Sequence, residues 1–108
     1  MEKIILKVTG KPSLRFTGEL LAEVNSSNIE STGNFSGSTT YWEKLYLYKT
    51  ARGKYVCGRA EHSLYGNSHT FIVEVYETID EVKDFFGYEW LAKDLYDEAN
   101  IDDAIEIE

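Results

Sequence analysis

The sequence has little of what several classes of site require. Its 108 residues include one Cys and two His. An internal disulfide is therefore excluded, and the four Cys or His ligands of a closed structural zinc site are not available. No apolar run approaches the roughly 20 residues of a transmembrane helix, and the amino end lacks the long apolar core of a signal peptide. We therefore expect a cytoplasmic protein that does not associate with membranes.

Positive charge is scarce and unevenly placed. The chain carries 11 Lys and Arg against 19 Asp and Glu, for a net charge of −8. This balance disfavours nonspecific binding to nucleic acid or to an anionic membrane. Residues 77–108 hold 12 acidic and two basic residues, a net of −10, so essentially all of the excess lies there. Such asymmetry indicates an interaction surface, although a solvated acidic surface that only aids solubility gives the same pattern.

The pattern of the first three quarters of the chain predicts strands. In residues 13–24, alternate positions from Leu14 to Val24 are mostly apolar and are expected to share one buried face, with Leu21 as the exception. Gly18 marks a bulge or a bend, and Pro12 a break before the strand. The segment at 70–76 is the most apolar and is expected to be central. The expected strands are residues 3–9, 13–24, 41–50, 54–61 and 70–76.

Polar segments separate these strands. Residues 25–40 are rich in Ser, Thr, Asn and Gly, which predicts a long, mobile loop. Residues 51–53 fit a tight hairpin connection that ends at Gly53. Residues 62–69 are expected to form a second loop.

After Tyr76 the apolar period changes from two residues to 3.6. Thr78 and Glu81 form a capping box that starts a helix, and Gly87 ends it. A second helix is expected from residue 88 to 99, ended by Asn100, and residues 104–108 form an edge strand or a tail. Residues 1–108 thus predict one α+β domain, in which an antiparallel sheet of about five strands precedes two C-terminal helices packed on one face. The expected apolar stripes of the helices are Ile79, Val82, Phe85 and Phe86, then Leu91, Ala92, Leu95 and Ala99.

The stretch FTGELLAEV at residues 16–24, followed by LYLYKTARGKYVCGRAEHS at 45–63, resembles a pattern in small uncharacterised bacterial proteins, some of them phage-associated. The matching residues are strand and hairpin positions, so no catalytic residue follows from the resemblance. What it implies is a protein carried by a mobile element.

The leading function is a non-enzymatic module that presents the acidic helical segment 77–108 to a basic partner. Trp90 lies off the apolar stripe beside acidic residues, as in a protein-binding hot spot, or it packs beneath the C-terminal tail. With the mobile-element resemblance, one concrete form is an inhibitor of a host nucleic-acid-binding complex, of the anti-CRISPR type. The expected partner-binding residues are Asp80, Asp84, Trp90, Asp94, Asp97 and Glu98. Reversal of the charge at Asp94, Asp97 and Glu98 is expected to leave the fold intact.

The first alternative is a module that binds single-stranded nucleic acid. Aromatic side chains of strand 41–50 would stack on bases while cations of the hairpin contact phosphates. Neither face of this strand is purely apolar, so its pattern leaves open which face is buried. The candidate residues are Trp42, Lys44, Lys49, Arg52 and Lys54, with Tyr46 and Tyr48 beside them. Lys49, Arg52 and Lys54 form a basic hairpin surface, and Arg59 is near it in the sequence.

The second alternative is a small-ligand binder or hydrolase around Cys57, His62 and His69. Mid-strand Cys57 has no helix N-terminus to lower its pKa, which favours a buried structural thiol over a nucleophile. Glu61 with the two histidines could hold a metal ion, but their spacing matches no metal-binding signature. The sequence therefore predicts no catalytic residue, no metal and no cofactor.

Overall fold

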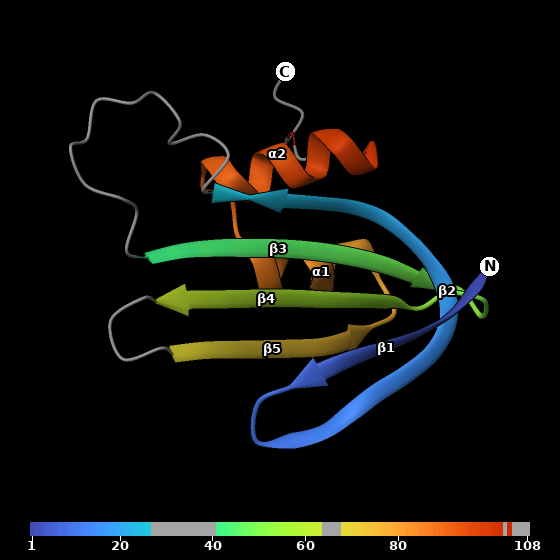
Figure 1. The fold of residues 1–108 in the computed structure, drawn as a ribbon. Coiled ribbons are helices and arrows are strands. Elements are labelled where there is room, and N and C mark those ends of the chain that lie inside the picture. Colours follow the sequence, from blue (N-terminus) through green and yellow to red (C-terminus); the bar gives the residue numbers. More distant parts are fainter. Residues whose placement is uncertain (27–40, 64–67, 103, 105–108) are drawn as a thin grey trace.

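The protein folds as a curled antiparallel sheet with two helices on one side (Figure 1). This computed structural model describes residues 1–26, 41–63, 68–102 and 104. The five strands lie in the order β1-β2-β3-β4-β5, which is also their order in the chain. The predicted α+β fold is confirmed. Of the predicted loop 25–40, Asn25 belongs to β2 and residues 27–40 lie outside the described residues, as do residues 105–108 of the predicted tail 104–108. The elements are β1 (Glu2–Val8), β2 (Lys11–Asn25), β3 (Tyr41–Thr50), β4 (Tyr55–Ser63), β5 (Ser68–Tyr76), α1 (Ile79–Phe86) and α2 (Trp90–Ala99).

The sequence predicted that the most apolar strand, β5, is central, but this strand is the last in the order of the sheet. Its outer side nevertheless meets the start of the sheet, because the curl brings the β1–β2 turn against it. The Thr9 N–H donates to the carbonyl of Phe71 at 2.9 Å, and the Phe71 N–H donates to Thr9 Oγ1 at 2.7 Å. The apolar strand β5 is therefore flanked by β4 on one side and contacts the β1–β2 turn on the other, instead of lying between two strands.

The first half of strand β2 pairs with β1 and the second half pairs with β3, and the strand bends strongly between the two halves (Figure 1). Gly18 lies at the change, opposite Glu2 of β1 and Thr50 of β3. A Cβ at this position would collide with the carbonyl oxygen of Lys49, so only glycine fits. Pro12 lies inside β2 rather than before it, at a register shift in the β1–β2 pairing where it interrupts no regular ladder.

A bulge at Leu21 divides the apolar residues of β2 between the two faces of the sheet. Leu20 is opposite Tyr48, but Ala22 is opposite Leu47, the next residue of β3. Because side chains alternate along a strand, one extra residue moves all later ones to the other face. The predicted single buried face of residues 14–24 is therefore wrong beyond Leu20.

Both faces of the sheet are buried, which settles the open question for β3. Leu45 and Leu47 lie under the helices, with 2% and 0% of their surfaces exposed, while Tyr46 is buried inside the curl of the sheet at 6%. The buried residues of the helix side are Ala22, Leu45, Leu47, Cys57, Val82, Phe86, Leu91, Ala92, Leu95 and Tyr96. Those inside the curl are Tyr46, Val56, Ala60 and Val73.

The helices begin and end close to the predicted residues. The capping box of Thr78 and Glu81 is present, and Gly87 ends α1 at a φ of 80°. Helix α2 starts two residues later than expected and ends at Asn100 in the left-handed conformation. Tyr96, which the sequence did not assign to the core, is fully buried and donates from its hydroxyl to the Gly87 carbonyl at 2.6 Å. In the described part of the chain, neither helix has the length and apolarity to cross a bilayer.

Candidate functional site

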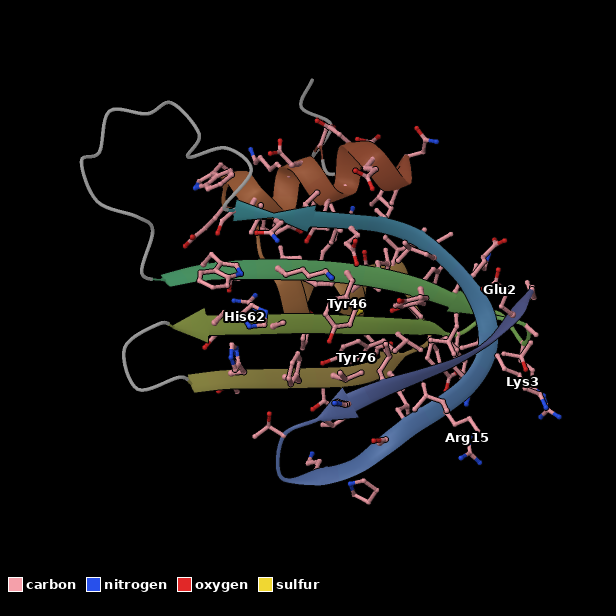
Figure 2. All side chains as sticks on the ribbon, in the orientation of Figure 1. Glu2, Lys3, Arg15, Tyr46, His62 and Tyr76 are labelled. Carbon is pink, nitrogen blue, oxygen red and sulfur yellow. The ribbon has the colours of Figure 1, made fainter. Side chains whose placement is uncertain are left out.

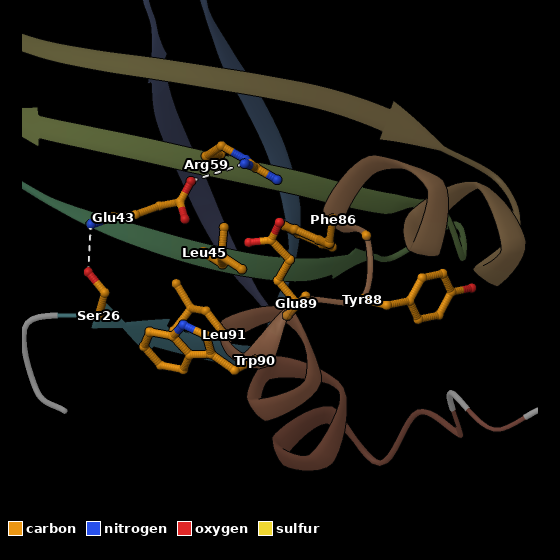
Figure 3. A pocket seen from close by; sticks show the side chains of 11 residues that line it. Ser26, Glu43, Leu45, Arg59, Phe86, Tyr88, Glu89, Trp90 and Leu91 are labelled. Atoms are coloured by element: carbon orange, nitrogen blue, oxygen red, sulfur yellow. Dashed lines mark hydrogen bonds and ion pairs between the residues drawn. The ribbon is translucent and has the colours of Figure 1, made fainter.

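The candidate functional site is a groove of about 500 Å³ between the sheet and the junction of the two helices (Figure 3). Strands β3 and β4 supply its sheet wall, while the end of α1, the connection at residues 87–89 and the start of α2 supply the other. Its lining residues are Ser26, Glu43, Leu45, Arg59, Phe86, Gly87, Tyr88, Glu89, Trp90, Leu91 and Ala92.

The sheet wall of this groove contains a fixed ion pair. Arg59 Nη1 lies 3.0 Å from Glu43 Oε2, and the guanidinium also donates to the Phe85 carbonyl at 3.4 Å and packs 5.8 Å from the ring centroid of Phe85. The Glu43 N–H donates to Ser26 Oγ at 2.9 Å. Arg59 is therefore neutralised and held on the helix side of the sheet, so it does not extend the basic hairpin surface.

The rim of the groove is aromatic and acidic. Tyr88 and Trp90 each expose 52% of their surface, and Glu89 lies between them in the chain. Figure 3 shows the Trp90 ring beside Leu91 at the groove, whereas the Tyr88 ring is directed away from it, on the other side of the connection. Glu89 is the N-cap residue of α2, but its carboxylate makes no capping hydrogen bond, and Figure 3 shows it directed into the groove beside Phe86. The possible cover of Trp90 by the C-terminal tail concerns residues outside the described ranges.

The predicted acidic residues fall into three groups. Asp80 and Asp84 are exposed on α1, which packs on β4 and β5, whereas Asp94 and Asp97 are exposed on α2, which packs on β2 and β3. The two aspartate pairs thus lie over different halves of the sheet. Glu98 is also on the surface, but its Oε1 accepts a hydrogen bond of 2.9 Å from the backbone of β2.

The aromatic part of the predicted nucleic-acid surface is largely occupied by internal contacts. Trp42 stacks on His62 with ring centroids 5.2 Å apart, and Lys44 pairs with Glu23 at 3.0 Å. Tyr46 is buried, so its ring cannot stack on a base (Figure 2).

The cations of that surface are dispersed. Lys49 lies on the opposite face of β3 from Lys44, with its Nζ 5.7 Å from the ring centroid of Tyr55. Arg52 and Lys54 are exposed in the hairpin at the far end of β3 from Trp42. The structure therefore does not bring the predicted nucleic-acid residues together.

The third predicted constellation is divided between the two faces of β4. Cys57 is fully buried under the helices, and burial raises the pKa of its thiol to about 12, so it stays protonated at neutral pH. His62 and His69 lie on the other face, opposite each other on β4 and β5 rather than in a loop. Glu61 alternates away from His62 and does not join the histidines. Among the described residues, no group of three or more His, Cys, Asp and Glu side chains could hold a metal ion.

The sequence had identified Trp90 but not the other groove residues. Tyr88 and Glu89 follow the helix-ending Gly87 directly, and such a short connection with two exposed aromatic residues is the local signal for this rim. Glu43 and Arg59 could not be found in this way, because their meeting depends on the register of β3 against β4. Comparison of the chain with protein-family models, curated proteins and solved structures finds no significant match.

Proposed function

We propose that this protein is a non-enzymatic interaction module that binds a basic partner at the helix-junction groove and the acidic surface around it. The observation that carries the proposal is the helix junction, where Trp90 is half exposed at the groove and Tyr88 is half exposed on the other side of the connection. Tyr and Trp are the side chains most enriched at binding hot spots, because they bury a large apolar area and offer a polar atom as well.

The electrostatics of the groove favour a cationic side chain of the partner. Arg59 is already paired with Glu43, whereas Glu89 has no capping role and is directed into the groove. A Lys or Arg entering there can pair with Glu89 and lie against the face of Trp90, an arrangement worth more when water is excluded. The exposed aspartates of the helices add attraction at longer range and accelerate association at low salt.

A more specific form of the proposal is inhibition of a host nucleic-acid-binding complex, of the anti-CRISPR type. Carboxylates on a folded scaffold can occupy Lys and Arg sites that otherwise hold phosphates. The net charge of −10 over residues 77–108 supports this form.

The test compares the wild-type protein with three variants in binding to a purified basic protein first captured from host lysate. We expect Trp90→Ala to weaken binding by on the order of 30-fold or more, as for a hot-spot residue. The double variant Asp94→Lys/Asp97→Lys should also weaken binding, and its difference from the wild type should grow as the salt concentration is lowered. The control, Arg52→Glu/Lys54→Glu, also reverses two charges, in the opposite direction and at the far hairpin, and should not weaken binding. Loss of binding in the hairpin variant alone would overturn the proposal in favour of the nucleic-acid alternative.

A further inference from the structure

His62 and His69 face each other directly across β4 and β5, on the face of the sheet away from the helices. Their Nδ1 atoms are 2.7 Å apart. A contact this short requires at least one neutral ring, because one nitrogen must donate a proton and the other must accept it. The pair is at the surface, so solvent reaches it.

Neighbouring rings orient His62 within the pair. Trp42 stacks on His62 with 5.2 Å between ring centroids, and Phe71 meets the same imidazole edge-on at 5.9 Å. The backbone of both histidines is held in the β4–β5 ladder, which continues to Ser63 and Ser68. Side chains oriented in this way lose little conformational freedom on binding a ligand.

The charges around the pair leave room for a cation. The Nδ1–Nδ1 contact already requires one ring to be neutral, which is the form of imidazole that binds metal ions. The charge of Lys44 opposes a bound cation, but Glu23 neutralises it at 3.0 Å.

We propose that His62 and His69 form a two-imidazole site for a late first-row divalent metal ion, namely Cu²⁺, Ni²⁺ or Zn²⁺. Metal–nitrogen bonds are about 2.0–2.1 Å long, so two imidazoles at square or tetrahedral angles on one ion place their nitrogens roughly 2.9–3.4 Å apart. The existing pair therefore needs to open by well under 1 Å, about the distance that a change of side-chain rotation supplies.

The described residues supply these two ligands and no third. Two nitrogens alone leave positions on such an ion for water. Such a site exchanges its ion readily and does not serve to hold the fold together. With nitrogen ligands only, affinity follows the general order of these ions, and Cu²⁺ binds most tightly. This inference is independent of the proposed function, which concerns the opposite side of the sheet.

The test uses the stacked indole as a reporter. The chain has two Trp residues, so Trp90→Phe leaves Trp42, which lies against His62, as the only source of indole fluorescence. Titration of this full-length variant with CuSO₄ should quench Trp42 at a stoichiometry of one, and calorimetry with ZnSO₄ should give weaker binding at the same site. MgCl₂ serves as the control for general attraction to carboxylates and should have no effect.

His62→Gln and His69→Gln, each made separately, should both lower the affinity for Cu²⁺. Removing a residue that only hydrogen-bonds to a metal ligand typically lowers metal affinity by about 10–100-fold, so removing a ligand itself should lower it at least about tenfold. Trp42→Phe should keep the calorimetric binding and lose only the optical signal. Cu²⁺ binding that survives both histidine substitutions, or its absence from the wild-type protein by calorimetry, would overturn the proposal.

Discussion

The carboxylate of Glu98, near the end of α2, accepts a hydrogen bond of 2.9 Å from the backbone N–H of Glu23 in β2. Glu23 lies just beyond the bulge at Leu21, in the half of β2 that has separated from β1. An N–H on such an open strand edge is a site for unwanted pairing with another chain. Glu98 therefore satisfies this donor and anchors α2, so it is not merely one more solvated acid.

This contact separates Glu98 from the other acidic residues of α2. Glu98→Lys should lower the free energy of unfolding by about 1–2 kcal/mol, because a charged acceptor is lost and a cation replaces it. Glu98→Gln keeps an acceptor oxygen and should cost less. The exposed Asp94→Lys and Asp97→Lys serve as controls and should stay within about 0.5 kcal/mol. Urea denaturation measures all four, and equal values for Glu98→Lys and the controls would contradict the anchoring role.

Gly58 is required by the ring that covers it. Tyr46 lies over Gly58 inside the curl of the sheet, and a Cβ there would collide with the ring. We expect Gly58→Ala to destabilise the fold by about 1–3 kcal/mol, as overpacked cores do. In a Tyr46→Ala background the same substitution should cost much less, since the obstructing ring is gone. A double-mutant cycle by denaturant unfolding checks this, and a penalty unchanged by the background would refute the steric cause.

The buried thiol makes stability depend on alkaline pH. Burial raises the pKa of Cys57 from 9.0 to about 12. Above pH 9 the unfolded chain loses this proton while the folded protein keeps it, so the folded state binds more protons and stability falls as pH rises. Cys57→Ala should remove the part of this decline that lies between pH 9 and 10.

Tyr46 gives an internal comparison for the same experiment. Its pKa is raised from 10.0 to about 12, chiefly by burial, so a decline above pH 10 should remain in Cys57→Ala. Denaturant midpoints of both proteins, measured under reducing conditions from pH 7 to pH 11 in steps of about one unit, distinguish these contributions. Identical profiles for wild type and variant would show that Cys57 is not the source. Because Cys57 is buried, a thiol reagent should also react slowly with it in the native protein.

Local signals predicted the helical part of the fold well. The capping box joins Thr78 to Glu81, and the Gly87 N–H donates to the carbonyl of Lys83. Each signal involves residues close together in the chain, so the sequence alone specifies both helix ends. Leu21 was visible as an exception to alternation, but the consequence of the bulge depends on which β3 residue lies opposite. A sequence pattern carries no information about that register.

The same limit explains the errors at the candidate sites. The sequence predicts a loop between His62 and His69, because their polar neighbours resemble turn residues, yet the two residues pair with each other and extend both strands. Arg59 is near the hairpin cations in the sequence, but in the structure it pairs with Glu43. In each case the role of the residue depends on a contact between neighbouring strands, which the sequence does not show.

The agreement between strand order and chain order has a kinetic consequence. Every strand pairs with the next segment of the chain, so each ladder can form by closing one local connection, and the sheet can grow from any hairpin. The link between Thr9 and Phe71 is the exception, since it joins residues 62 positions apart. Closure of the curl should therefore come last in folding and open first in the native state, with faster amide exchange at Thr9 and Phe71 than at the buried Val56.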